Sequence, residues 1–395
     1  MKRVLLFSAL LVAGLLGSQL LPGLADGTAP AAREAIRLAT MLCLSFIMIH
    51  VGYEFELDRA RWRSLAVDYG VAATAAAFPW IFAAVYFVWV LGPPGALSSF
   101  DAWKEALLTA RFAAPTSAGI LFSMLAAAGL AATWLFRKAR VLAIFDDLDT
   151  VLLMIPLKIL IVGPRWQLAV VVLVMGVQLW MAWRYLHAWR IPTRWPFVIA
   201  YSAGIVAVSE AIYQGTRLID DVVPVHVEVL LPAFVLGVMM ARPAGHDPHR
   251  DDAREGHQEG PESPDEQRVA TLISAAFMVL VGLSMPPVAA EGGTGWGTLA
   301  LHVLAVTALA NLGKMFPLFT YRREAHWRER LALCIGMWPR GEVGAGVLVI
   351  SIGYGIGGPM LTVATLSLAL NLLLTGAFIW AAKRLLRSVP APSLA

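Results

Sequence analysis

Three carboxylates lie close together in an otherwise apolar stretch, FDDLDTVLLMIPL at residues 145–157. A charge inside hydrocarbon is costly, so Asp146, Asp147 and Asp149 must each pair, hold a proton or face water. Adjacent helical residues point about 100° apart, so one of the adjacent pair can hold a structural partner while the other faces a cavity. Asp149, three positions after Asp146, returns near the same face. A turn of this kind is suited to binding a proton or a cation reversibly.

Two further apolar stretches carry charges that match these acids in depth. LHVLAVTALANLGKMFPLF holds Lys314, and LALCIGMWPRGEVGAGVLVISIG holds Arg340 and Glu342 just after Pro339. Counted at 1.5 Å per residue from the nearest basic cluster, Asp146, Lys314 and Arg340 lie roughly 9, 12 and 15 Å into the protein. Opposite charges at overlapping depths indicate a common polar centre.

A proline interrupts two of the apolar stretches. EALLTARFAAPTSAGILFSML contains Pro115, Thr116 and Ser117, and the stretch with Pro339 runs in the opposite direction across the membrane. A proline breaks the helical hydrogen-bond ladder, and the hydroxyls and freed carbonyls are hard oxygen ligands. Paired interrupted helices of opposite direction point to inverted repeats with a site near the middle of the bilayer.

The elements that position these residues must be membrane helices. The chain is 58% hydrophobic and 15% charged, with a mean hydropathy of +0.69, whereas soluble domains average about 25% charged residues. Because lipid-exposed backbone must satisfy its own hydrogen bonds, helices are expected. The sequence predicts an all-α polytopic protein in which residues 1–395 form a single membrane domain. We expect twelve spans of roughly 20 residues, at about 4–22, 36–55, 65–92, 105–130, 140–163, 166–187, 195–213, 225–242, 269–287, 296–320, 331–354 and 359–382.

Basic residues gather in alternate connecting segments. With a cytoplasmic N-terminus, the inside segments hold 22 of the 31 lysines and arginines. This distribution follows the positive-inside rule and predicts a multi-pass protein of the cell's inner (plasma) membrane with both termini cytoplasmic. It explains the basic pI without a nucleic-acid partner. Lys2 and Arg3 before an apolar run also fit a signal peptide, but a retained first helix gives the regular loop alternation.

Residues 243–267 differ from the rest of the chain, with eight acidic residues, three histidines and four prolines. This composition predicts a solvated, flexible cytoplasmic linker, although His246 and His249 could instead bind a metal. The two cysteines, Cys43 and Cys334, provide neither a disulfide framework nor a zinc spacing.

Four motifs follow one another in order along the chain: APTSAGI at 114–120, FDDLDTVLLMIPL at 145–157, Lys314, and PRGEVGAGVLV at 339–349. Together they resemble the monovalent cation/proton antiporter family, in its electrogenic sodium/proton branch with the paired-aspartate motif. Two weaker matches support them, LPAFVLGVMMA at 231–241 and FMVLVGLSMP at 277–286. The resemblance extends over about residues 40 to 385.

The resemblance implies a fold with two crossed discontinuous helices, the fourth and eleventh segments, in a core domain beside a dimerisation domain. It implies a homodimer that exchanges a monovalent cation, Na⁺ first among the choices, for protons by alternating access. Such a protein is a secondary transporter rather than an enzyme. It needs no cofactor and no metal beyond the transported Na⁺, Li⁺ or K⁺.

The resemblance also implies roles for individual residues. Asp147 would bind the cation and the proton alternately, while Asp146 would pair with Lys314 in one state. The remaining members of the implied site are lining hydroxyls and a supporting ion pair: Thr116 and Ser117, and Arg340 with Glu342.

Other features depart from the family pattern. Pro115 stands where a small or hydroxyl residue is expected, and Asp149 and Lys158 add charges to the paired-aspartate helix. Asp149 could be a structural partner or part of the ion pathway, and we expect Arg111 and Lys158 near the outer surface or in ion pairs. There are two simpler alternatives. The acids could form a purely structural network, and Lys314 could extend to the cytoplasmic surface. A K⁺/H⁺ exchanger or another solute transporter on the same fold is the alternative function.

Overall fold

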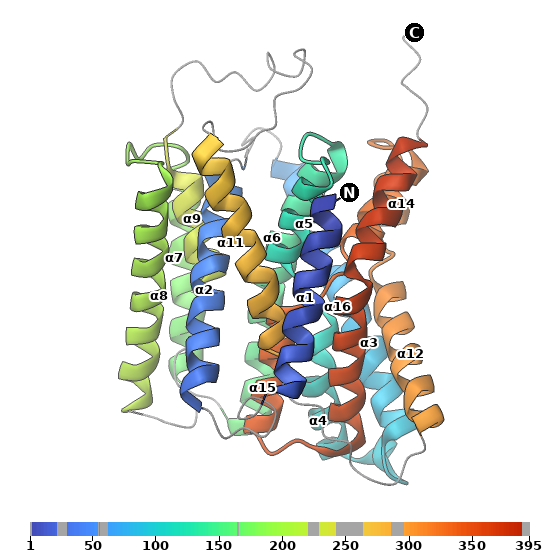
Figure 1. The fold of residues 1–395 in the computed structure, drawn as a ribbon. Coiled ribbons are helices and arrows are strands. Elements are labelled where there is room, and N and C mark those ends of the chain that lie inside the picture. The colour runs from blue at the N-terminus through green and yellow to red at the C-terminus, as the bar shows by residue number, and fades with distance from the viewer. Residues whose placement is uncertain are drawn as a thin grey trace. The chain divides into compact units, whose positions relative to one another are not determined.

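The computed structural model describes residues 2–21, 30–53, 55, 62–163, 166–219, 229–241, 264–285 and 296–388, and it is built of α-helices (Figure 1). Each of the twelve predicted segments contains a helix, so the predicted all-α polytopic fold is confirmed. By length and composition, nine helices in the described residues could cross a membrane. Asp146, Asp147 and Asp149, named the acidic turn from here on, lie on α6 (Trp134–Val162). This helix is not among the nine because it carries several charged residues.

The chain forms two compact units. Unit 1 comprises Met1–Ile36, Arg59–Ile161 and Met278–Ala395, and unit 2 comprises Arg37–Asp58 and Val162–Phe277. Besides α6, the helices of unit 1 are α1 (Lys2–Leu20), α3 (Trp62–Tyr86), α4 (Phe100–Ala110), α5 (Ala118–Ala127), α12 (Trp296–Gly313), α13 (Pro317–Thr320), α14 (Trp327–Gly336), α15 (Glu342–Gly353) and α16 (Gly358–Arg387). Those lying wholly or mainly in unit 2 are α2 (Pro30–Tyr53), α7 (Trp166–Arg184), α8 (Trp195–Arg217), α9 (Leu230–Met239) and α11 (Pro264–Leu283).

In unit 2, α2 and α9 approach each other at glycines. A Cβ added at Gly52 would lie 2.2 Å from the carbonyl oxygen of Phe234, and one at Gly237 would lie 2.1 Å from that of Ile49. Small residues allow helix backbones in a membrane to approach closely enough for good packing. These two positions therefore fix the contact between α2 and α9.

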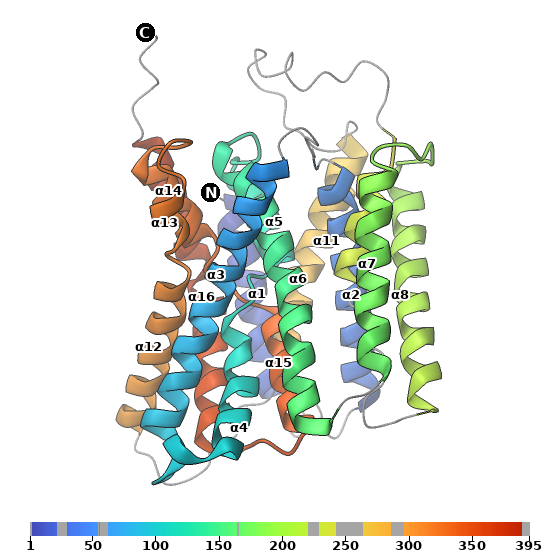
Figure 2. The same cartoon turned by 180° about the vertical axis from the view of Figure 1, so that it is seen from behind.

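Unit 1 contains two interrupted helices, as predicted for the fourth and eleventh segments. The α4 helix continues into a short 3₁₀ turn, η4 (Arg111–Ala113), and the chain is then non-helical until α5 begins. The second interruption separates α14 from α15. Within unit 1, α4 and α15 lie toward one end and α5 and α14 toward the other, so the two interrupted helices run in opposite directions (Figures 1 and 2).

The predicted span 296–320 is one of the nine candidate spans in the described residues, and its helix is interrupted by a turn at Lys314. The α12 helix ends at Gly313, and α13 starts at Pro317. Proline lacks the N–H group that a continuous helix needs and disfavours helical backbone in the residue before it. Lys314 therefore lies in a turn inside the protein rather than on a regular helix.

The predicted linker 243–267 is too long at its C-terminal end. Residues 242–263 lie outside the described part of the chain, but α11 begins at Pro264. Proline is favoured in the first turn of a helix, and Asp265 and Glu266 complement the positive end of the helix dipole. These residues therefore start the helix although their composition resembles that of the linker.

Candidate ion-binding site

The two interruptions meet where α5 begins and α14 ends, and this meeting point is named the crossing. The backbone N–H of Ser117 donates to the carbonyl oxygen of Pro339 at 2.9 Å, and the Thr116 hydroxyl donates to that of Met337 at 3.0 Å. A Cβ added at Gly341 would lie 2.8 Å from Ile120 Cδ1 and 3.1 Å from Ser117 Oγ. The two extended segments thus satisfy part of each other's backbone, which is a condition for irregular chain inside a membrane protein.

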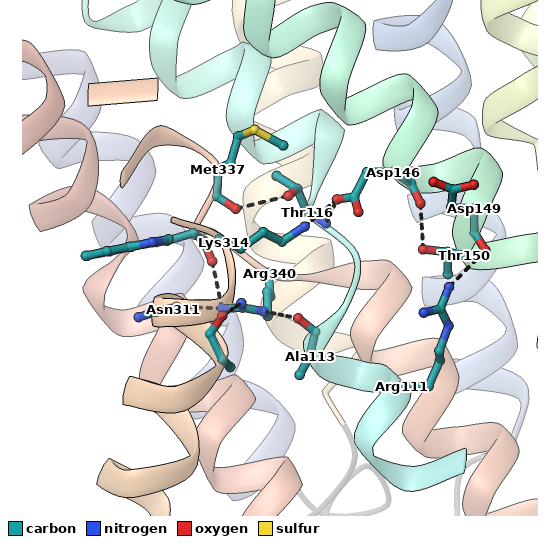
Figure 3. A network of polar contacts seen from close by, with 12 residues as sticks. Arg111, Ala113, Thr116, Asp146, Asp149, Thr150, Asn311, Lys314, Met337 and Arg340 are labelled. Carbon is teal, nitrogen blue, oxygen red and sulfur yellow. Dashed lines mark hydrogen bonds and ion pairs between the residues drawn. The ribbon is translucent and has the colours of Figure 1, made fainter. Parts of the chain in front are cut away.

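Asp146 joins this crossing to α6. Its side chain is fully buried, and its Oδ2 accepts hydrogen bonds from Lys314 Nζ at 2.6 Å and from the backbone N–H of Thr116 at 2.7 Å (Figure 3). A short contact between an ammonium and a carboxylate is a charge-assisted hydrogen bond, the stronger kind. Asp146 Oδ1 has no hydrogen-bond partner among the described residues. The contact between Asp146 and Lys314 that the resemblance implies is therefore present.

Asp147 is the next residue of the same turn. Its side chain is 7% exposed, against 0% for Asp146, and it interacts electrostatically with Lys314. Neighbouring residues of a helix point in different directions, so the two acids are not equivalent. Asp146 is tied to the crossing by two hydrogen bonds, whereas Asp147 is the more accessible of the pair.

Asp149 lies on the same face one turn further along α6. Its Oδ1 accepts a hydrogen bond from the Tyr69 hydroxyl of α3 at 2.8 Å. Its main-chain oxygen accepts one from Arg111 Nη2 at 2.9 Å, and Arg111 is fully buried. Arg111 was expected near the outer surface or in an ion pair. The structure shows a buried side chain that reaches the backbone of Asp149 from the 3₁₀ turn before the crossing.

Arg340 lies on the other side of the crossing and is hydrogen-bonded throughout. Nε donates to the carbonyl oxygen of Ala113 at 2.7 Å, Nη2 to that of Ala310 at 2.8 Å, and Nη1 to Asn311 Oδ1 at 2.7 Å and the carbonyl oxygen of Trp338 at 3.1 Å. These acceptors come from both sides of the crossing and from α12. Arg340 therefore fixes three chain segments to one another.

The supporting ion pair predicted between Arg340 and Glu342 cannot be compared with the structure, because the Glu342 side chain lies outside the described part of the chain. Asn371 of α16 is a hydrogen-bond partner of Arg340 that was not predicted. Its Oδ1 accepts from the backbone N–H of Arg340 at 3.1 Å, and its Nδ2 donates to Asn311 Oδ1 at 3.1 Å. An asparagine in the apolar segment 359–382 is the sequence signal that could have pointed to this role.

The predicted site residues whose side chains are described therefore gather in unit 1 around one crossing. Ser117 takes a capping role, since its Oγ accepts the backbone N–H of Ile120 at 3.3 Å and so starts α5. Thr116 contacts Asp146 through its backbone N–H rather than its hydroxyl. The Lys158 side chain lies outside the described part. Tyr69 and Asn371 are contacts that the sequence reasoning missed.

The chain is similar to known proteins in sequence and in fold. A sequence model of the family described as "Sodium/hydrogen exchanger, transmembrane" matches residues 3–380. Among solved structures, the chain is similar to that of the sodium proton antiporter MjNhaP1 from Methanocaldococcus jannaschii at pH 8. The two share 15% sequence identity with a TM-score of 0.59, over 97% of this chain and 92% of that one. No curated protein matches the chain at a significant level.

Proposed function

Because the chain belongs to the sodium/hydrogen exchanger family, and is thus a multi-pass secondary transporter that exchanges cations for protons, we propose that Na⁺ is the exchanged cation and Asp147 the shared carrier. The observation that supports this assignment is the inequality of the two adjacent acids. Asp146 Oδ2 holds Lys314 and the Thr116 backbone, and Asp147 is the more accessible of the two.

One carboxylate is enough for antiport if the cation and the proton compete for it. Burial favours the protonated acid, while nearby positive charge favours the carboxylate. When protons are scarce, deprotonated Asp147 binds the cation. When protons are abundant, it binds a proton and releases the cation. Alternating access of unit 1 to the two sides of the membrane turns this competition into exchange.

Lys314 is the second proton carrier in this proposal. When Asp147 takes up the cation, the Lys314 ammonium gives its proton to water and releases Asp146, whose carboxylate then helps to hold the cation. When the cation leaves, Lys314 and Asp147 each take up one proton. Two protons are then exchanged for one cation, so each cycle moves one net charge.

The remaining residues support the carrier. Thr116 donates its backbone N–H to Asp146, and Ser117 caps the start of α5 next to it. Arg340 holds the crossing in shape through its hydrogen bonds. Glu342 would be its charged partner and Asp149 a neighbouring charge. The family needs no cofactor, since its substrates are the transported ions themselves.

The orientation in the membrane follows from the basic residues. In unit 1, α1 begins and α16 ends at the end where α14 lies (Figure 1). Both helices carry basic residues there, Lys2 and Arg3 at one and Arg384 and Arg387 at the other. By the positive-inside rule this end is cytoplasmic, and we place the protein in the inner (plasma) membrane as a homodimer.

Cation selectivity is tested with purified protein in proteoliposomes that contain a pH-sensitive dye. Na⁺, Li⁺ and K⁺ are added in turn, and the proposal expects proton movement with Na⁺ and Li⁺. Movement with K⁺ alone would assign a K⁺/H⁺ exchanger instead. Absence of movement with all three cations, in vesicles shown to contain folded protein, would contradict cation exchange itself.

Stoichiometry is tested separately with a membrane potential imposed by potassium and valinomycin. Exchange of two protons for one Na⁺ is accelerated by a potential that drives positive charge in the direction of proton movement, and slowed by the opposite potential. A rate that ignores the potential would exclude the role of Lys314 as second proton carrier and leave Asp147 as the only one.

A further inference from the structure

Arg111 places a full positive charge next to the acidic turn without a full set of hydrogen bonds. Its side chain is completely buried, and its guanidinium lies over the Trp80 ring, 4.9 Å from the centroid. Nη2 donates to the main-chain oxygen of Asp149, but Nε and Nη1 have no hydrogen-bond partner among the described residues. Because a guanidinium stays charged at any physiological pH, this charge must be balanced from nearby.

Arg111 reaches Asp149 at its main-chain oxygen, and the carboxyl group of the same residue is also buried. Its side chain is 3% exposed. Oδ1 accepts the Tyr69 hydroxyl, and Oδ2 has no hydrogen-bond partner among the described residues. Figure 3 shows Arg111 and Lys314 reaching the acidic turn from different sides, Arg111 at Asp149 and Lys314 at Asp146. Lys314 thus pairs with the carboxylate of Asp146, whereas Arg111 reaches the turn at the backbone of Asp149.

These charges act on one another across the turn. Arg111 interacts electrostatically with Asp146 as well as Asp149, and Asp149 interacts with Asp146, Arg111 and Lys314. Tyr69 is the titratable group facing Asp149 from α3. Screening by water and salt is weak between buried charges. A change of charge at Asp149 or Arg111 therefore acts on Asp146, whose partner Lys314 in turn interacts with Asp147.

We propose that Arg111 and Asp149 form a charge-compensating pair whose opposite effects on the affinity of Asp147 for cation and proton cancel. Alone, Arg111 would repel an arriving cation and loosen a bound proton. Alone, Asp149 would attract both. When both charges are present their effects cancel, and the affinity of Asp147 for cation and proton then depends on Asp146 and Lys314. The inference rests on the proposed function, since it concerns the same carrier.

The pair is tested by charge removal on each side, in proteoliposomes with Na⁺ as the cation. Asp149→Asn leaves Arg111 uncompensated, and we expect an apparent KM for Na⁺ about tenfold higher and a pH profile shifted to lower pH by about one unit, the two being equivalent in free energy. Arg111→Gln should lower KM and shift the profile to higher pH. The double variant should return both values close to those of wild type.

Opposite shifts that cancel are specific to charge compensation. A merely structural pair would lower the maximal rate in both single variants and leave the pH profiles in place, which would overturn the inference. Asp101→Asn is a matched control, because Asp101 starts α4 with its side chain 79% exposed, and it should change neither value.

Two outcomes keep the inference separate from its premise. Wild-type vesicles that show no Na⁺-driven proton movement would contradict the proposed function. Wild-type vesicles that transport while Asp149→Asn keeps the wild-type KM and pH profile would contradict the inference alone. If Arg111→Gln alone is not recovered folded, the comparison of Asp149→Asn with the double variant still decides, because only compensation predicts that removing Arg111 as well restores the KM and the pH profile.

Discussion

Unit 1 has two buried charge clusters, Arg340 with its hydrogen-bond partners and the acidic turn. They differ in how completely their polar atoms are hydrogen-bonded. Arg340 donates to three carbonyl oxygens and to Asn311. In the acidic turn, by contrast, Asp146 Oδ1 and Asp149 Oδ2 have no hydrogen-bond partner among the described residues. Buried polar groups that are hydrogen-bonded stabilise a fold, whereas buried polar groups without a hydrogen bond cost free energy unless a ligand provides one. The comparison separates a cluster that holds the crossing together from a turn with oxygens available to a cation or a proton.

The largest effect on stability is expected at Arg340 and its hydrogen-bond partners, the bonded cluster. Arg340→Leu leaves several buried acceptors unsatisfied, each of which costs about 1–3 kcal/mol. We expect a loss of several kcal/mol, seen as a much lower melting temperature of the detergent-purified protein or as failure to fold. A variant that melts like wild type would show that Arg340 does not hold the crossing.

A smaller stability effect with a larger functional consequence is expected at Lys314. Lys314→Met removes the cation from Asp146 Oδ2, and the buried carboxylate can then remain only by taking up a proton. We expect folded protein that exchanges one proton per cation, so the rate no longer responds to the membrane potential. Arg330→Met, which changes a basic residue of α14, is the control and should keep the response.

If Lys314→Met still responds to the potential as wild type does, the second proton binds elsewhere. The contrast between the two clusters would survive that result, but the assignment of Lys314 as a carrier would not.

The fold was largely predictable because its signals are local. Long apolar runs gave the helices, and Pro115 and Pro339 gave the two interruptions. The break at Lys314 was missed, although Pro317 was visible, because a proline near the end of a long apolar run can also be accommodated by a kink.

The candidate site was predictable where a motif carries it and not where distant segments meet. Asp146 and Lys314 were matched through their resemblance to a family pattern. The contact of Tyr69 with Asp149 joins residues 80 positions apart, and the inward turn of Arg111 depends on the 3₁₀ geometry of η4. No spacing rule yields either contact from the sequence.

A moderate effect is expected where the two interrupted helices touch. Gly341→Ala would place a Cβ 2.8 Å from Ile120 Cδ1 and 3.2 Å from Ser117 Cβ, so the end of the Ile120 side chain must move aside and Ser117 must shift by a few tenths of an ångström. Overpacking of this kind costs about 1–3 kcal/mol. We expect a lower melting temperature and a lower transport rate, whereas Gly346→Ala, with open space around the added Cβ, should behave like wild type.

If Gly341→Ala and Gly346→Ala are equally stable, close contact at the crossing is not needed for the fold. The bonded cluster at Arg340 would then be sufficient to hold the interrupted helices together.

The smallest effect is expected at Thr116. Thr116→Val removes the hydrogen bond to the carbonyl oxygen of Met337 but keeps the backbone N–H that donates to Asp146. One such bond contributes about 1 kcal/mol. We expect slightly reduced stability and a KM for Na⁺ within a few-fold of wild type in the proteoliposome assay. A complete loss of transport would mean that the hydroxyl itself binds the cation.

The central claim, that Asp147 carries both cation and proton, is tested most directly by Asp147→Asn. Wild type, Asp147→Asn and the exposed control Asp101→Asn are reconstituted in equal amounts, and Na⁺-driven proton movement is followed with a pH-sensitive dye. An amide binds neither a proton nor a cation as a carboxylate does, so the account predicts full transport in the control and none in Asp147→Asn. Na⁺-driven proton movement that persists in Asp147→Asn would contradict it.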